Sequence, residues 1–221
     1  ASGGYMAAGI GSGLQGLGTV TIEGDAVIKN AQGGEAGAGI GSGTRGNSEI
    51  IIRGDAVIEN AESSANGAGI GSGQGVVHYD DDTGKMIIDK KTVGNVTIEG
   101  NAKIENAKSG YGGSGIGGGP IGIGNVIIRG NAQIGNATGG DEGAGIGGGG
   151  SDYDRNNDPN RGTLGGDAKV KIRGKNTIIK AKGHLGAGIG GGSVYNPAIS
   201  GVHNGGSAEI EITDGATVKE A

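Results

Sequence analysis

The tripeptide Gly-Ile-Gly recurs six times along the 221 residues of the chain. Its isoleucines are Ile10, Ile40, Ile70, Ile116, Ile146 and Ile189, so three of the five intervals are 30 residues long and the other two are 46 and 43. A second landmark is the first apolar residue of the next extended segment, such as Val20 in the first unit. From this landmark to the isoleucine of the following Gly-Ile-Gly, the distance is 20 residues in four units and 19 in the fifth. The variation in length therefore falls in one segment, directly after Gly-Ile-Gly, and the repeat indicates a stack of similar units.

Each unit contains three short segments with a side-chain period of two, which the first unit shows at residues 8–12, 20–23 and 26–29. The second segment has Val or Ile at its first and third positions in every unit and a polar residue at its fourth. The third segment keeps Ala or Asn and then Ile or Val at alternate positions. Such alternation is typical of β-strands with one buried face and one solvent face.

Three strands per unit cannot bury an apolar face alone, so the units must stack on one another. The sequence therefore predicts an all-β fold, a right-handed parallel β-helix of about six coils of 30 residues with three short strands per coil. We expect a single domain over residues 1–221, with coils near 1–30, 31–60, 61–106, 107–136, 137–180 and 181–221. Insertions are expected near 74–93, 150–166 and 193–207.

Composition limits which residues can fill the core and which partners the chain can bind. The chain has 57 glycines and no Phe, Trp or Cys, so Ile, Val and Ala must fill the core, and neither disulfides nor thiolate metal sites are available. A net charge of −5 without a basic block argues against nucleic acid as a partner. No apolar run reaches the roughly 20 residues of a membrane span. Because the outer coils carry no polar cap, we expect flanking domains or a homo-oligomer to cover the ends.

Stacking places equivalent residues of successive coils side by side. The column Glu23, Arg53, Glu99 and Arg129 alternates in sign, which predicts a ladder of ion pairs. A second column, Asn30, Asn60, Asn106 and Asn136, predicts a ladder of amide hydrogen bonds. We interpret both ladders as structural.

The glycines on either side of each repeated isoleucine are expected to point away from the core. Two interpretations follow for pairs such as Gly9 and Gly11. They form either a tight corner that requires positive φ or a flat strip on which a partner chain or a polysaccharide docks.

The three insertions should leave the same corner of the stack, and loops on a rigid scaffold commonly carry binding sites. The insertions contain aromatic rings and imidazoles that can contact a ligand. The candidate ligand-binding residues are therefore Tyr79, Tyr153, Tyr195, His78 and His203. Oxygen ligands at alternate positions, Asp152, Asp154, Asn156 and Asp158, are similar to the start of a calcium loop. The Gly and Glu that complete such a loop are missing, so a solvated acidic loop is the alternative.

No pair of residues in the sequence has a spacing that identifies it as catalytic. The loop aspartates could supply the two carboxylates of a glycosidase, but their spacing selects no pair. A polysaccharide lyase would need a base beside a cation, and the spacing of the histidines and arginines does not identify one either.

The repeated Gly-Ala-Gly-Ile-Gly-Ser-Gly, followed by Val-Thr-Ile-Glu-Gly-Asp-Ala, resembles the glycine-rich repeats of surface proteins of Gram-positive and gut bacteria. The expected architecture resembles the pectin-lyase-type β-helix, which polysaccharide lyases, glycosidases, adhesins and phage tailspikes share. The resemblance implies a non-catalytic extracellular or cell-surface protein of a bacterium or phage, a rigid scaffold for adhesion or surface recognition of carbohydrate. The alternatives are a calcium-assisted polysaccharide-binding protein and a polysaccharide lyase or glycoside hydrolase.

Overall fold

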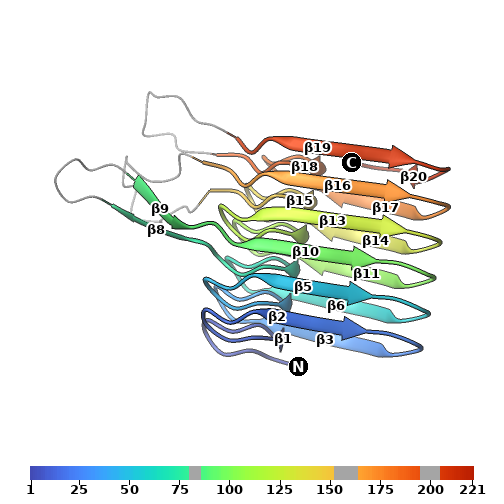
Figure 1. Cartoon of the computed structure of the whole chain (residues 1–221), viewed down its shortest axis with the longest axis horizontal. Helices are drawn as coiled ribbons and strands as arrows, with labels where there is room; N and C mark the ends of the chain where they lie inside the picture. The colour runs from blue at the N-terminus through green and yellow to red at the C-terminus, as the bar shows by residue number, and fades with distance from the viewer. Residues whose placement is uncertain (80–85, 152–163, 195–204) are drawn as a thin grey trace.

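The structure is a computed structural model that describes residues 1–79, 86–151, 164–194 and 205–221. These residues form three parallel six-stranded sheets, and successive coils contribute neighbouring strands to each sheet, so the strands stack one above another (Figure 1). The chain is therefore a parallel β-helix, as its repeat predicts. The described ranges contain no helix, and hence none that is long and apolar enough to cross a membrane.

The three sheets follow one another within each coil. The first sheet consists of the two-residue Ile-Gly strands β1 (Ile10–Gly11), β4 (Ile40–Gly41), β7 (Ile70–Gly71), β12 (Ile116–Gly117), β15 (Ile146–Gly147) and β18 (Ile189–Gly190). The second sheet consists of β2 (Gly18–Ile22), β5 (Ser48–Ile52), β10 (Val93–Ile98), β13 (Ile123–Arg129), β16 (Ala168–Arg173) and β19 (Ala208–Thr213). The third consists of β3 (Val27–Gly33), β6 (Val57–Ser63), β11 (Lys103–Lys108), β14 (Gln133–Thr138), β17 (Thr177–Lys182) and β20 (Thr217–Val218). An antiparallel hairpin, β8 (Val76–Tyr79) and β9 (Met86–Lys90), leaves coil three between its first and second sheets.

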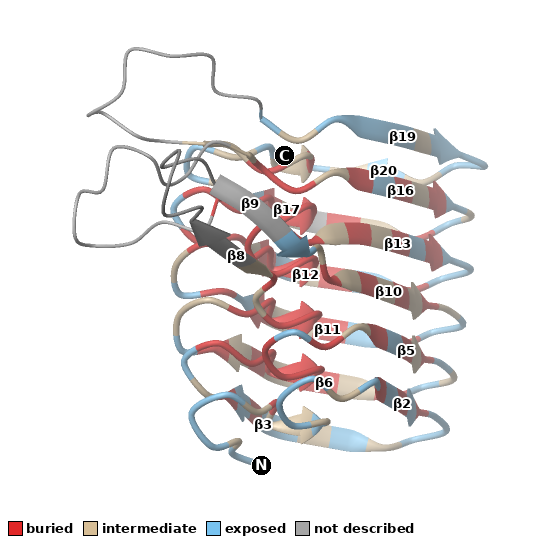
Figure 2. Cartoon of the chain, turned by 60° about the vertical axis from the view of Figure 1, so that its left-hand side comes forward, coloured by how far each residue is buried: buried red, intermediate tan, exposed pale blue. Residues whose placement is uncertain are grey.

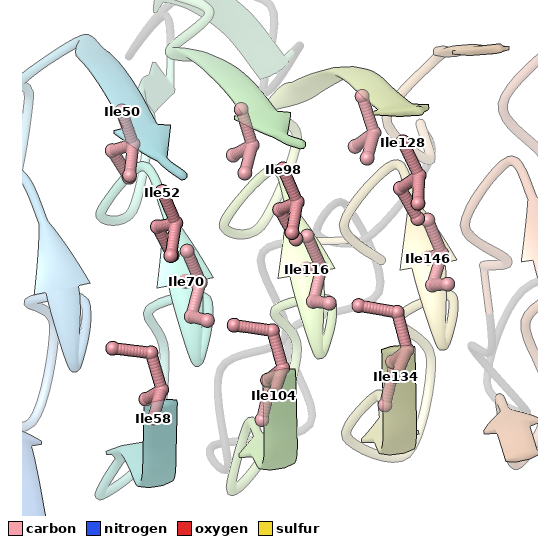
Figure 3. Close-up of a cluster of buried hydrophobic side chains, with 14 of the residues drawn as sticks. Ile50, Ile52, Ile58, Ile70, Ile98, Ile104, Ile116, Ile128, Ile134 and Ile146 are labelled. Carbon is pink, nitrogen blue, oxygen red and sulfur yellow. The ribbon is translucent and has the colours of Figure 1, made fainter. Parts of the chain in front are cut away.

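Columns of isoleucine fill the interior. Ile40 pairs in register with Ile10 on one side and Ile70 on the other, and the second and third sheets continue the same pattern. Figure 3 shows the isoleucines of successive coils projecting into one shared core. Those of the middle coils are fully buried, and each such side chain contributes about 1.5–3 kcal/mol. The single polar residue in the inward alanine column, Asn176, is also buried and donates to the carbonyl oxygen of Arg173 at 2.7 Å.

The predicted amide ladder is present on the outer surface, and the charged column forms two ion pairs, one between coils one and two and one between coils three and four. Arg53 donates to Glu23 at 2.7 Å, and Arg129 donates to Glu99 at 2.5 Å. In the amide ladder, each asparagine donates to the side-chain oxygen of its predecessor at 3.0–3.2 Å, through Asn60, Asn106 and Asn136. These groups are largely exposed, so the amide ladder and the ion pairs guide the register of the coils more than they add to stability.

The glycines of the first sheet are not an exposed strip. In the middle coils Gly39, Gly41, Gly69 and Gly71 are buried. The segments that flank each strand fold over it, since Thr44 donates its backbone N–H to Met6 and Gln74 donates to Ala36 in the neighbouring coil. The interpretation of this strip as a docking surface is therefore wrong.

The alternative interpretation, a corner that requires positive φ, is correct for the second glycine of each pair. The first glycine, such as Gly39, does not have positive φ, but a Cβ there would overlap with the backbone of Glu62 in the third sheet. The glycine that follows the isoleucine has φ between +134° and +145° in all six coils, a region that side-chain-bearing residues rarely enter. A Cβ on Gly41 would overlap with the carbonyl oxygen of Gly71 in the next coil. Positive φ and close backbone contact thus both demand glycine at this position.

Replacing Gly41 by alanine should destabilise the fold by about 3–5 kcal/mol, because backbone strain adds to steric overlap. Gly13→Ala is the matched control, since Gly13 lies just beyond the same sheet and a Cβ there meets nothing within 4 Å. Urea unfolding followed by circular dichroism measures both variants. Equal stability of the two variants would refute the requirement for glycine.

Candidate functional site

The outer face of the second sheet is organised in straight rows of side chains. Because Val96 and Ile98 point into the core, the residues that alternate with them point outward. Register pairing then aligns equivalent positions of successive coils parallel to the axis of the stack. One row contains Thr19, Glu49, Asn95, Asn125, Lys169 and Glu209, and the next contains Thr21, Ile51, Thr97, Ile127, Lys171 and Glu211.

A groove of about 310 Å³ lies between these rows over strands β5, β10, β13 and β16. Its polar lining combines amides, a hydroxyl, a carboxylate and two ammonium groups, with an exposed aliphatic side chain among them. The lining residues are Glu49, Asn95, Val96, Thr97, Asn125, Val126, Ile127, Lys169 and Lys171.

The amide side of the groove is fixed by hydrogen bonds along the axis. Asn95 donates to a carboxylate oxygen of Glu49 at 3.1 Å, and Asn125 donates to the side-chain oxygen of Asn95 at 2.9 Å. Strands that are locked into a parallel sheet carry these side chains. The polar groups are therefore held in place before any ligand arrives, which reduces the entropic cost of binding.

An apolar surface lies directly beside these amides. Ile127 is 39 % exposed although it occupies a sheet in the middle of the stack, and its register neighbours are Thr97 and Lys171. Ile51 lies in the same row on the other side of Thr97. A ligand in the groove would thus contact hydrocarbon and hydrogen-bonding groups at the same time.

Asp167 joins the ends of all three insertions at one corner of the stack. Its Oδ1 accepts hydrogen bonds from the Ser207 backbone N–H at 3.0 Å and hydroxyl at 2.9 Å, and its Oδ2 accepts from Lys91 Nζ at 3.4 Å. Lys91 and Ser207 lie at the ends of the first and third insertions, and Asp167 directly follows the second. The β8–β9 hairpin projects from this same side of the stack (Figures 1 and 2).

The protonation of Asp167 reflects these contacts. Partial burial raises the pKa of the carboxyl group, but the hydrogen bonds from Ser207 and the positive charge of Lys91 outweigh it and leave the pKa below its ordinary value. Asp167 is therefore ionised at neutral pH and can hold the corner together.

Hydrogen bonds to a buried carboxylate also fix the start of the second insertion. The Ser151 backbone N–H donates to a carboxylate oxygen of Glu142 at 2.9 Å, and the Ser151 hydroxyl donates to the same oxygen. Glu142 is only 5 % exposed. Nearby, the buried Ile121 has φ of +53°, which is strained for a β-branched residue.

Most of the residues that the sequence suggests as ligands lie outside the described ranges. These are Tyr153, Tyr195 and His203, together with the proposed calcium ligands Asp152, Asp154, Asn156 and Asp158. His78 and Tyr79 belong to β8, but their side chains are also outside the described part. Among the described residues, no group of three or more His, Asp or Glu side chains is arranged to hold a metal ion.

Sequence reasoning missed the groove and the role of Asp167. The outward positions of the second segment carried the signal for the groove, because their residues mix amides, Thr, Ile and Lys where a merely solvated face would be charged. Asp167 had no comparable signal, since its partners are 76 and 40 residues away in the chain.

No family model, no curated protein and no solved structure matches the chain.

Removing the Asp167 carboxylate should loosen the corner. Because its pKa is lowered in the folded chain, its stabilisation is fully present above the unfolded-state pKa of about 3.9 and is lost as the pH falls through the folded value. Asp167→Ala at neutral pH should speed hydrogen exchange in peptides that contain Lys91 and Ser207 about two- to fivefold. Acidification of the unmodified chain should lower the protection factors of the same peptides, once the slower intrinsic exchange of amides at low pH is corrected for. Asp25→Ala, an exposed turn residue, is the control. Unchanged exchange in Asp167→Ala would show that the carboxylate does not join the insertions.

Proposed function

We propose that the chain is a non-catalytic, extracellular or cell-surface scaffold that recognises carbohydrate along the groove of the second sheet. The observation that carries the proposal is the groove itself, which spans four coils and combines hydrogen-bonding groups with the exposed aliphatic side chain of Ile127. The rigid core supports it, because every strand beneath the groove is held by neighbours on both sides.

Carbohydrate fits the chemistry of this lining. A sugar ring presents C–H groups on its faces and hydroxyls on its edges, and the groove offers Ile127 beside Asn125 and Thr97. The coils repeat every 4.8 Å or so along the axis. If an extended sugar chain runs along the axis, each successive sugar unit would contact the equivalent position of the next coil.

The extracellular setting follows from the resemblance of the repeats to those of bacterial surface proteins. The absence of cysteine is compatible with that setting, since the stack needs no disulfide to hold it together. Three insertions that leave one corner beside the groove would add contacts to a bound chain. Tyr79, Tyr153, Tyr195, His78 and His203 are the residues we propose for those contacts.

Blocking the groove should weaken carbohydrate binding. In Thr97→Met, a long neutral side chain would fill the middle of the groove, and we expect affinity to fall at least about tenfold. Gln133→Met is the matched control, because Gln133 is exposed on the third sheet, outside the groove. A polysaccharide and glycan array, followed by calorimetry on the best ligand, measures the effect.

The same array separates the alternatives. Binding that disappears with a chelator would favour a calcium-assisted protein with ligands at Asp152, Asp154, Asn156 and Asp158. Release of shortened or unsaturated products would favour a glycoside hydrolase or a lyase. Binding to no carbohydrate, or equal binding by Thr97→Met and the unmodified chain, would contradict the proposal.

A further inference from the structure

The charge of the groove changes abruptly between coils four and five. On β13 the outward residues of the groove are the neutral Asn125 and Ile127. Their register partners on β16 are Lys169 and Lys171, and the next outward residue of that strand is Arg173. The wall of the groove over β16 is therefore made of cations, whereas the opposite end over β5 carries the Glu49 carboxylate.

The acidic residues of coil six only partly neutralise this wall. Lys169 pairs with Glu209 at 2.9 Å. Both oxygens of Glu211 accept hydrogen bonds from Arg173 at 2.7 Å, whereas the Nζ of Lys171 lies 3.5 Å from the same carboxylate. Three cations thus face two carboxylates across this strand pair.

Lys171 is the cation with the weakest partner. The hydrogen bonds from Arg173 lower the pKa of Glu211 more than its slight burial raises it, so Glu211 is ionised and already engaged. A third carboxylate, Asp214, acts on Arg173 and is not part of the groove lining. The surplus positive charge is therefore centred on Lys171, directly beside the exposed Ile127.

We infer that the ligand of the groove is an acidic polysaccharide whose carboxylate or sulfate groups pair with Lys171. This inference rests on the proposed function and specifies its ligand class. The sugar ring lies on Ile127, its hydroxyls face Asn125 and Thr97, and its anionic substituent points towards coil five. Such a pairing is a charge-assisted hydrogen bond at a partly exposed site, and it weakens as salt is added.

The test uses polymers that share one backbone and differ only in charge. Dextran, carboxymethyl-dextran and dextran sulfate are compared by biolayer interferometry at low and at physiological salt. We expect carboxymethyl-dextran, dextran sulfate or both to bind more tightly than dextran, and the preferred polymer identifies the anionic group.

Two lysine variants separate a specific contact from general attraction. Lys171→Gln should lower affinity for the preferred anionic polymer about three- to tenfold and remove its advantage over dextran. Lys180→Gln should change neither quantity. Lys180 belongs to the same coil and pairs with Glu220 at 3.0 Å, but it lies on the third sheet, outside the groove. Thermal melts of both variants establish that each is folded.

Several outcomes would overturn the inference. Equal losses in Lys171→Gln and Lys180→Gln would mean that anions are attracted by overall charge alone. If dextran and its acidic derivatives bind equally and Thr97→Met weakens all of them, the acidic ligand is refuted and carbohydrate recognition stands. If Thr97→Met leaves the binding of neutral and acidic carbohydrates unchanged, both the groove and its ligand class are refuted.

Discussion

The close backbone approach at the glycine corner is the constraint on which the stack depends. After each inward isoleucine of the first sheet, the chain turns through a glycine with φ near +140°, and the carbonyl of the next coil occupies the space where a Cβ would be. Coils can stack in register here because neither backbone carries a side chain between them. The glycine content that would suggest disorder in another protein is what permits this packing.

Register then determines both faces of each sheet. When Ile40 stacks on Ile70 inside, the outward residues of the second sheet must also align in rows. The groove is a consequence of that alignment, since outward side chains of four coils line it. A rigid core thus fixes the spacing of recognition groups that are far apart in sequence, such as Asn95 and Lys169, without any dedicated loop.

Sequence periodicity predicted most of the fold because the alternation of residues 20–23 and 26–29 reports directly which side chains are inward. It predicted the inward position of Asn176 and the ion pair between Glu23 and Arg53 for the same reason. It could not decide the environment of glycines such as Gly41, because what covers the outer side of a strand depends on how the flanking segments fold back. The groove and the Asp167 contacts depend on distances between coils, which the order of residues alone does not provide.

The register of the coils can be measured directly because the chain contains no cysteine. Val57 and Lys103 are 46 residues apart and face outward as register partners in adjacent strands of the third sheet. Paired Val57→Cys and Lys103→Cys substitutions should form a disulfide under mild oxidation, because adjacent coils are about 4.8 Å apart. Val57→Cys with Gln133→Cys, one coil further along, should not. A cross-link in the second pair, or none in the first, would contradict in-register stacking.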